Sequence, residues 1–402
     1  MQKMAEAEED GRKSSDLQRT GPATAQILHE SILKFSVDLY AQLQTQNRGG
    51  ENLVFSPFSI AVALTMVLAG ARKNTAEELA SLLYVKDHSD KGHEHFPEFL
   101  SGLRGFAPDV EFYVASRVYS DRQFPVSKGY RSHLESSYGA TVGSVDFKKD
   151  HKSIRLEANA WVSDQTATKI QDLLPPGIVN AGTALILLNA IYFKGFWKSP
   201  FRAADTAPRN FHLDSKNTVK VDTMFQVGES YRLGSSNELR ARALEIPYRG
   251  GMMSMVILLP DGMEGLPFLE RLLSWERLGS LLRCLKRSNN VQVSIPKLKL
   301  EQGHVLNDVL KSLGVADLFI PGVADLSGIF ERGKPAVSGI VHKTFLQVDE
   351  EGTEAADAAA IVLCSAKSTR RPICFTVDHP FMFLIKSKEP DVILFIGSVR
   401  KP

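Results

Sequence analysis

Apolar residues near the N-terminus repeat with the period of a helix. Five of them recur at three- and four-residue spacing and therefore share one helical face: Leu28, Ile32, Phe35, Leu39 and Leu43. The stretch NLVFSPFSIAVALTMVLAGA is apolar nearly all round, which predicts a buried helix that begins near Ser56 and Pro57. A third helix is predicted over NTAEELASLL, with Asn74 or Thr75 as its N-cap.

Strand patterns dominate the second half of the chain. Runs rich in β-branched and aromatic residues predict strands over 110–121, 183–195, 241–248, 253–262 and 290–301. Between them, residues 264–287 have a helical pattern. Because helices come first and no regular β-α-β alternation follows, the pattern favours an α+β fold with large mixed sheets. The chain shows no internal repeat or linker, so we predict a disordered tail over 1–23 and a single domain over 24–402.

Composition excludes several classes of protein. The 402 residues are 43% hydrophobic and carry a net charge of +2, which indicates neither a nucleic-acid partner nor an acidic substrate. No apolar run reaches the length of a membrane span, and the polar N-terminus lacks a secretory signal. The protein therefore stays inside the cell, or a signal was removed before this numbering begins. The absence of an Asn-x-Ser/Thr acceptor slightly favours the cell interior.

Motifs for catalysis or metal binding are missing. The chain has no G-x-S-x-G elbow, H-E-x-x-H, P-loop or G-x-G-x-x-G, so we predict neither an enzyme nor a cofactor. His93 and His95 would point to different faces of a helix, which argues against a metal site. Two groups of cations predict either a solvated helix face or weak binding of a sulfated polysaccharide: residues 148–155, and Arg277 with Arg283, Lys286 and Arg287.

One stretch does not fit ordinary structure. DEEGTEAADAAA (349–360) has the Ala content of a helix, yet it contains Gly352 and continues into the strand-like IVLC. It is followed by SAKSTRRP, which resembles an exposed protease substrate. A run of small side chains that suits helix or strand thus precedes a cleavable segment.

Motifs distributed in order along the chain resemble those of the serpin family. They are FTVDHPFMFLI (375–385), NLVFSPFSIAVAL, NAWVSDQTATKI (159–170), LLNAIYFKGFWKSPF (187–201), EIPYRGGMMSMVILLPDG, DLSGIF and VHKTFLQVDEEGTEAADAAA (341–360). The resemblance extends from about Ala25 to the C-terminus and is nearest to arthropod serpins. It implies eight or nine helices around three β-sheets, with an exposed reactive-centre loop at about 350–374.

The resemblance also implies a function. Most serpins are suicide inhibitors of serine or cysteine proteases: the protease cleaves the loop, forms an acyl-enzyme, and is trapped when the loop inserts into the central sheet. The partner would be a trypsin-like or elastase-like protease. We expect a monomer, without a nucleic-acid or membrane partner, and extracellular, with a cytoplasmic location as the alternative. The alternative function is that of a non-inhibitory serpin that acts as carrier, chaperone or signalling ligand.

The family register places the reactive bond. Counting from Gly352 selects Ala366, whose methyl group suits an elastase-like pocket. Lys367, the next residue, would suit a trypsin-like pocket with a buried carboxylate. Arg370 is the alternative bait, but it lies beyond the family register. After a cut there, the loop would be too long to hold the protease against the far end of the sheet, and the protease should escape.

The resemblance implies a hinge that inserts first, formed by Glu350, Glu351, Gly352, Thr353, Ala355, Asp357 and Ala359. Every second side chain from Thr353 would enter the buried face of the sheet, and small side chains enter with little loss of rotamer entropy. Asp357 departs from this pattern because burying an unpaired carboxylate costs several kcal/mol. Either Asp357 finds a partner, or insertion slows and the protein behaves more like a substrate.

Further residues match family positions that control opening of the sheet. Ser56, Ser59, Asn189 and His342 match the shutter beneath the parting strands. Trp197 matches the aromatic residue at the breach, where the loop first enters, and Lys297 with Glu350 matches an ion pair at the same place.

Three cysteines leave two questions open. Cys364 and Cys374 flank the bait, as two free thiols or as an oxidised pair that would hinder insertion. Cys284 is predicted to be a small core residue.

Overall fold

The computed structural model describes residues 22–47, 50–86, 94–103, 105, 107–350 and 371–402. Residues 1–21 of the predicted tail (1–23) therefore lie outside the described residues, whereas its last two residues belong to the first helix. The segment 351–370, with most of the hinge and all of the proposed cleavage sites, also lies outside them. The described parts contain nine α-helices: α1 (Pro22–Gln46), α2 (Pro57–Gly70), α3 (Lys73–Leu82), α4 (His95–Leu103), α5 (Lys128–His133), α6 (Phe147–Gln165), α7 (Leu266–Leu272), α8 (Trp275–Arg283) and α9 (Asn307–Ser312).

The first two helices follow the sequence pattern closely. All five residues of the predicted face of α1 are buried. In α2 twelve residues are buried, Pro57 occupies the first turn, and the Ser56 side chain accepts a hydrogen bond from the Ser59 backbone N–H. A helix that is apolar all round needs such burial, and a serine N-cap fixes where it begins.

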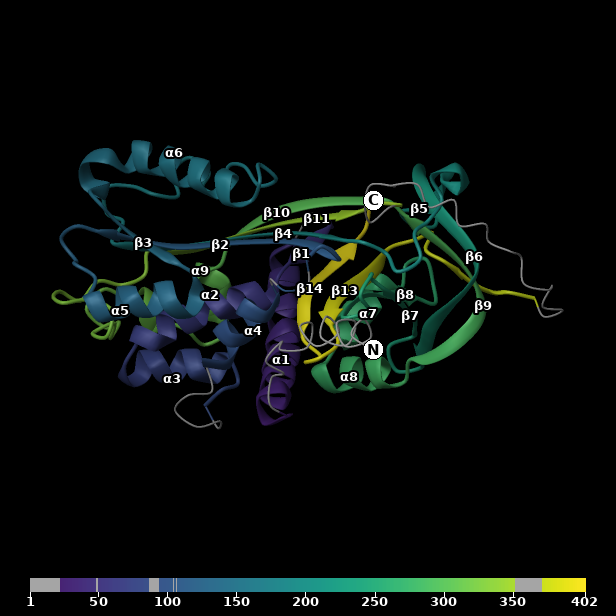
Figure 1. Ribbon diagram of the computed structural model, residues 1–402, viewed down its shortest axis with the longest axis horizontal. Coiled ribbons are helices and arrows are strands. Elements are labelled where there is room, and N and C mark those ends of the chain that lie inside the picture. The colour runs from purple at the N-terminus through teal and green to yellow at the C-terminus, as the bar shows by residue number, and fades with distance from the viewer. Residues whose placement is uncertain (1–21, 48–49, 87–93, 104, 106, 351–370) are drawn as a thin grey trace, which may run out of the picture.

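A five-stranded sheet forms the long axis of the molecule (Figure 1). Its strands are, in spatial order, β10 (Leu298–Val305), β11 (Gly339–Val348), β4 (Leu185–Gly195), β2 (Val110–Asp121) and β3 (Thr141–Val145). The central pair, β11 and β4, is parallel, and its register runs from Gly339 opposite Ile186 to Gln347 opposite Lys194. Both neighbours of this pair, β10 and β2, run antiparallel to it.

A nine-stranded sheet contains the remaining strands. Its order is β1 (Leu53–Phe55), β14 (Ile393–Val399), β13 (Phe381–Ser387), β8 (Met253–Pro260), β7 (Ala241–Pro247), β6 (Thr218–Ser236), β9 (Lys286–Pro296) and β12 (Ile373–Thr376), with β5 (Ala207–His212) also paired to β6. The end of β6 pairs with β7, whereas its start pairs with β5. The long strand β6 thus joins two parts, and with the five-stranded sheet these make three sheets, as expected.

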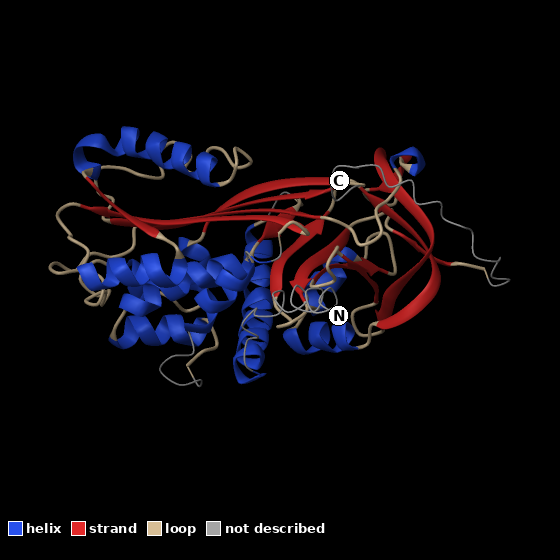
Figure 2. Ribbon diagram, viewed as in Figure 1, coloured by secondary structure: helices blue, strands red, loops and turns tan. Residues whose placement is uncertain are grey.

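Helices cover both faces of the five-stranded sheet (Figures 1 and 2). On one face α6 packs with the segment that follows it over apolar residues of β4 and β11, including Ile186, Leu188, Val341 and Phe345. On the other face α2, α4 and α5 lie beneath the sheet and continue into the main core. The central strands are therefore buried on both faces.

Several local predictions are wrong for identifiable reasons. The stretch predicted as one strand over 290–301 is two strands in different sheets, because the chain turns between Pro296 and Leu298. The predicted helix over 264–287 is two helices, α7 and α8, and its last residues begin β9. Helix α3 begins one residue before Asn74, and its N-cap residue, Arg72, provides no side-chain hydrogen bond.

Cysteine 284 is also placed differently from the prediction. Cys284 caps the C-terminus of α8 and is exposed rather than packed in the core. Cys374 is an exposed free thiol, and Cys364 lies outside the described residues.

Candidate functional site

A row of polar residues crosses the middle of the five-stranded sheet. Ser116 of β2, Asn189 of β4, His342 of β11 and His304 of β10 stand opposite one another on four adjacent strands. Residues directly opposite in neighbouring strands share one face of the sheet. The strand register therefore brings together four residues that lie up to 226 positions apart in the sequence.

The N-terminus of α2 meets this row from below. Ser59 Oγ donates to Asn189 Oδ1 at 2.9 Å, and Asn189 Nδ2 donates to Ser116 Oγ at 3.0 Å. Ser56 donates from its hydroxyl to the Leu394 carbonyl of β14 at 2.6 Å. The cluster thus links α2 to both sheets, and all of its groups are buried.

The hydrogen bonds of His342 determine its tautomer. The Ser56 backbone N–H donates to Nε2 at 3.1 Å, so Nε2 must be the acceptor nitrogen. Nδ1 then carries the proton and donates to Asn189 Oδ1 at 2.6 Å, across the β4–β11 pair. Burial holds the pKa of His342 well below its usual range, and the neighbouring His304 lowers that pKa further. His342 is therefore neutral in the closed sheet.

His304 packs beside His342 on the next strand. The two imidazole rings are stacked with centroids 6.5 Å apart and an interplanar angle of 11°, and His304 Nε2 lies 3.1 Å from the Val54 carbonyl. Burial also lowers the pKa of His304, although the hydrogen bond to Val54 opposes that shift. Thr344 completes this side of the cluster, with Oγ1 2.7 Å from His342 Nε2.

A second group of contacts holds the chain where β11 ends. Trp197 Nε1 donates to the Asp349 carbonyl at 2.8 Å, and its indole stacks on Tyr248 at 4.6 Å. The Asp349 carboxylate pairs with Lys194 of β4 at 3.1 Å. The backbone just before residue 351 is therefore fixed from two sides.

Lys297 and Glu350 meet at the same place. Their Nζ and Oε2 atoms are 2.8 Å apart, and Glu350 is only 9% exposed. Burial is the largest single influence on Glu350 and by itself would raise its pKa, but the hydrogen bonds that the carboxylate accepts, the one from Lys297 first, and the charge of Lys297 together outweigh burial, and the pKa is lowered. The same bond raises the pKa of Lys297. Both groups are charged at neutral pH.

The structure brings together every candidate residue of the sheet that lies in the described part of the chain. Ser56, Ser59, Asn189 and His342 form one cluster, and Trp197, Lys297 and Glu350 form the other. The remaining candidates lie outside the described residues: Glu351, Gly352, Thr353, Ala355, Asp357, Ala359, Ala366, Lys367 and Arg370.

Sequence reasoning missed Ser116, His304, Thr344 and the Lys194–Asp349 pair. A polar residue inside an apolar strand was a usable signal for Ser116 and Thr344. His304 and Lys194 could be placed only with the strand register, because their partners belong to other strands.

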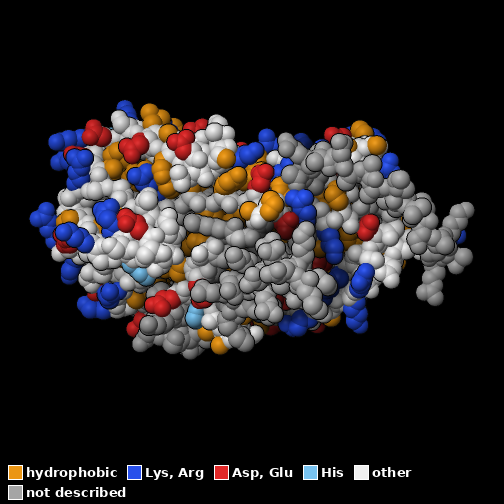
Figure 3. Space-filling model, viewed as in Figure 1, with side chains coloured by type: hydrophobic (Ala, Val, Ile, Leu, Met, Phe, Trp, Pro, Cys, Tyr) orange, Lys and Arg blue, Asp and Glu red, His pale blue; other side chains and the backbone are white. Residues whose placement is uncertain are grey.

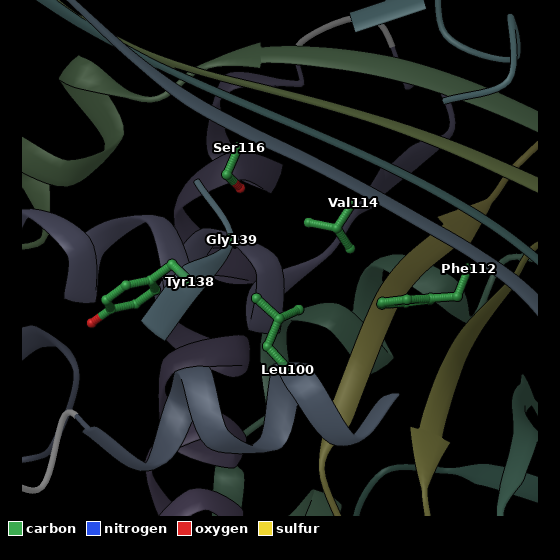
Figure 4. A pocket seen from close by; sticks show the side chains of 6 residues that line it. All are labelled: Leu100, Phe112, Val114, Ser116, Tyr138 and Gly139. Carbon is green, nitrogen blue, oxygen red and sulfur yellow. The ribbon is translucent and has the colours of Figure 1, made fainter. Parts of the chain in front are cut away.

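A small pocket lies behind the cluster, between α4 and β2. Leu100, Phe112, Val114, Ser116, Tyr138 and Gly139 line it (Figure 4). Among the described residues no group of three or more His, Cys, Asp or Glu side chains could hold a metal ion. No helix in that part of the chain is long and apolar enough to cross a membrane.

Comparisons with known proteins agree with this architecture. The family model described as "Serpin (serine protease inhibitor)" matches residues 30–402. The chain is 48% identical to Iris from the tick Ixodes ricinus, over 93% of this chain and 99% of that protein. It is 37% identical to the leukocyte elastase inhibitor of Homo sapiens, over 93% and 99%. The crystal structure of uncleaved ovalbumin superposes with a TM-score of 0.86 at 28% identity, over 93% of this chain and all of that one.

Proposed function

Because the chain belongs to the serpin family, we propose that it is a suicide inhibitor of a serine or cysteine protease. The protease would cleave the segment after Glu350, and the cleaved segment would insert between β4 and β11. The observation that supports this most is the central parallel pair, because its strand β11 ends at Val348, directly before the hinge. On this proposal the protein is an inhibitor and not an enzyme.

Insertion has a physical driving force in this sheet. A strand that returns from residue 352 beside β11 would run antiparallel to both β11 and β4. One parallel ladder would be replaced by two antiparallel ladders, which are slightly more stable per residue. The strand would also bury its side chains between α6 and the main core.

The polar row is proposed as the element that resists opening. The Asn189–His342 hydrogen bond spans the two strands that must part, and the bonds to Ser59 and Ser56 tie both strands to α2. These bonds must break before a strand can enter. A buried network of this kind resists opening because each broken bond leaves an unpaired polar group.

The contacts of Trp197, Lys194 and Lys297 are proposed to hold the start of the hinge closed. All three bind Asp349 or Glu350, the last described residues before the hinge continues. Insertion would begin here, since these residues lie nearest to the end of β11.

The register of an inserted strand gives Asp357 a partner. If residues 349–352 form the connection, Thr353 would lie opposite Val348 and Asp357 opposite Thr344. Ala359 would then lie opposite His342. Thr344 already donates its hydroxyl inside the cluster and could donate to the Asp357 carboxylate instead. This register therefore favours accommodation of Asp357 over failure of insertion.

We propose cleavage after Ala366 or after Lys367, and simple turnover after Arg370. The name of the leukocyte elastase inhibitor, a relative, agrees with an elastase-like target for Ala366. Cleavage after Lys367 would instead indicate a trypsin-like target. The proposal also includes a monomeric protein with an extracellular or cytoplasmic location. It further includes weak binding of a sulfated polysaccharide.

The second candidate is a non-inhibitory serpin, which would act as carrier, chaperone or signalling ligand. Asp357 is the sequence feature that favours it. The two candidates are distinguished by mixing the protein with elastase-like and trypsin-like proteases. The inhibitor predicts an SDS-stable adduct near the sum of the two masses with at least one protease. Cleavage by every protease without an adduct would favour the second candidate.

A further inference from the structure

A row of aromatic rings crosses the five-stranded sheet on the face that α6 covers. Tyr113 of β2 stands opposite Tyr192 of β4, and Tyr192 stands opposite Phe345 of β11. The ring centres are 5.7 Å apart in the first pair and 5.4 Å apart in the second. The polar row lies on the other face, because Tyr192 is an odd number of residues from Asn189 and side chains alternate along a strand. The seam between β4 and β11 is therefore bridged on both faces.

The two rings at the seam are buried. Tyr192 is 0% and Phe345 6% exposed, and both belong to the apolar cluster beneath α6 and the segment 166–182 that follows it. Hydrophobic side chains are visible between α6 and the sheet in the space-filling view (Figure 3). The Nζ atom of Lys299 on β10 lies 5.6 Å from the centre of the Phe345 ring. A ring pair at this separation stabilises a structure beyond the area that it buries.

The segment that follows α6 contacts both strands of the seam. The Nζ atom of Lys169 lies 5.5 Å from the centre of the Tyr192 ring on β4. Lys343 of β11 donates a hydrogen bond to the Gln171 carbonyl. The segment therefore lies across the seam and covers the rings.

The ring pair lies between the hinge and the polar row. Phe345 is about 10 Å from Val348 at the end of β11, and about 10 Å from His342 in the other direction, at about 3.3 Å per residue. A strand that entered from the end of β11 would reach the rings first. Its entry would increase the separation of β4 and β11 from about 5 Å to about 10 Å, so the two facing rings would no longer touch.

We propose that Tyr192 and Phe345 form an aromatic latch, which holds the seam closed on the α6 face and sets the rate at which a strand enters. This inference rests on the proposed function, because it requires insertion between β4 and β11. Tyr113 is not part of the latch, since β2 and β4 remain paired when the seam opens.

The rate at which a synthetic peptide enters the sheet tests the proposal without a protease. A labelled peptide with the sequence of residues 353–366 is added to the intact protein, and its binding is followed by fluorescence. Phe345→Leu keeps an apolar side chain and removes the ring contact across the seam. It should speed entry of the peptide about fivefold, which corresponds to about 1 kcal/mol for an aromatic pair.

Tyr113→Leu is the matched control. It also removes a ring contact with Tyr192, but within the β2–β4 pair, which insertion leaves together. Both variants should lower the Tm of the intact protein, because each loses a packed ring. Only Phe345→Leu should speed entry, whereas Tyr113→Leu should stay within about twofold of the wild type. Should Phe345→Leu not fold, Phe345→Met, with its unbranched side chain, makes the same comparison.

Two results would overturn the latch alone: equal acceleration by the substitutions at 345 and 113, or no acceleration by the substitution at 345. In both cases the wild type still takes up the peptide, and insertion itself stands. A wild-type protein that neither takes up the peptide nor gains in Tm after cleavage would refute the proposed function, and the latch with it.

Discussion

Acidification should weaken the closed fold through the His304–His342 pair. The two rings are stacked and buried in the sheet, and the pKa of each is lowered, in His342 also by the presence of His304. A proton is therefore bound more weakly in the closed sheet than in an opened or unfolded chain. The stabilisation is fully present above the unfolded pKa of about 6.5 and is lost as the pH falls below it.

The size of the loss in stability follows from the number of buried histidines that take up a proton. A histidine that stays neutral in the folded protein lowers the free energy of unfolding by about 1 kcal/mol between pH 6.5 and 5.5. Two such histidines lower it by about 2 kcal/mol, which for a chain of 402 residues corresponds to a fall in Tm of roughly 2–3 °C. The groups that contact the pair are Ser56, Asn189, Thr344, Phe55 and the Val54 carbonyl, and none of them titrates in this range.

The assay compares Tm at pH 7.5 and 5.5 for the wild type and for His304→Phe. Phenylalanine preserves the edge contact with Phe55 and removes one titrating group. The variant loses the bond to Val54, about 1 kcal/mol at both pH values, but its fall in Tm on acidification should be about half that of the wild type. All other histidines are present in both proteins, so their contributions to the fall in Tm cancel when the two proteins are compared. An equal fall in the two proteins would refute the reasoning.

Three further predictions concern the loop and its hinge. Thr353→Arg should abolish trapping and leave cleavage intact, because a long cation would have to enter the buried face first; a gel that still shows the adduct would contradict this. If Thr344 donates a hydrogen bond to the Asp357 carboxylate, the Asp357→Ala variant should need a number of inhibitor molecules per protease within about twofold of the wild-type number. A large decrease in that number would show that Asp357 slows insertion. Lys297→Met should speed spontaneous loop insertion, which is measured as the loss of inhibitory activity on storage. The increase should be no more than about fivefold, because the Lys297 side chain is 40% exposed and such ion pairs contribute at most about 1 kcal/mol. An unchanged rate would mean that the Lys297–Glu350 pair does not hold the hinge.

Elements that are specified by a short stretch of neighbouring residues could be predicted from the sequence. The period of Leu28 to Leu43 and the Ser56–Pro57 start of α2 are local signals, and both predictions are confirmed. The α+β class and the serpin fold are confirmed as well, the latter because the motifs occur in family order along the chain.

What depends on distant contacts could not be predicted. The strand over 290–301 divides at Lys297 because each half pairs with a different sheet, which no local pattern reveals. Cys284 is exposed because α8 ends beside it, whereas residue type alone suggested the core. The row of Ser116, Asn189, His342 and His304 required the register of four strands.

The measurement that tests the central claim most directly is the Tm of the protein before and after cleavage in the segment 351–370. If about ten inserted residues each add one hydrogen bond of about 1 kcal/mol, the cleaved protein gains on the order of 10 kcal/mol. Its Tm should then rise by about 12 °C over that of the intact protein, because unfolding of 402 residues has an entropy of about 0.8 kcal/mol/K. A cleaved protein that melts at the same temperature as the intact one would contradict insertion between β4 and β11.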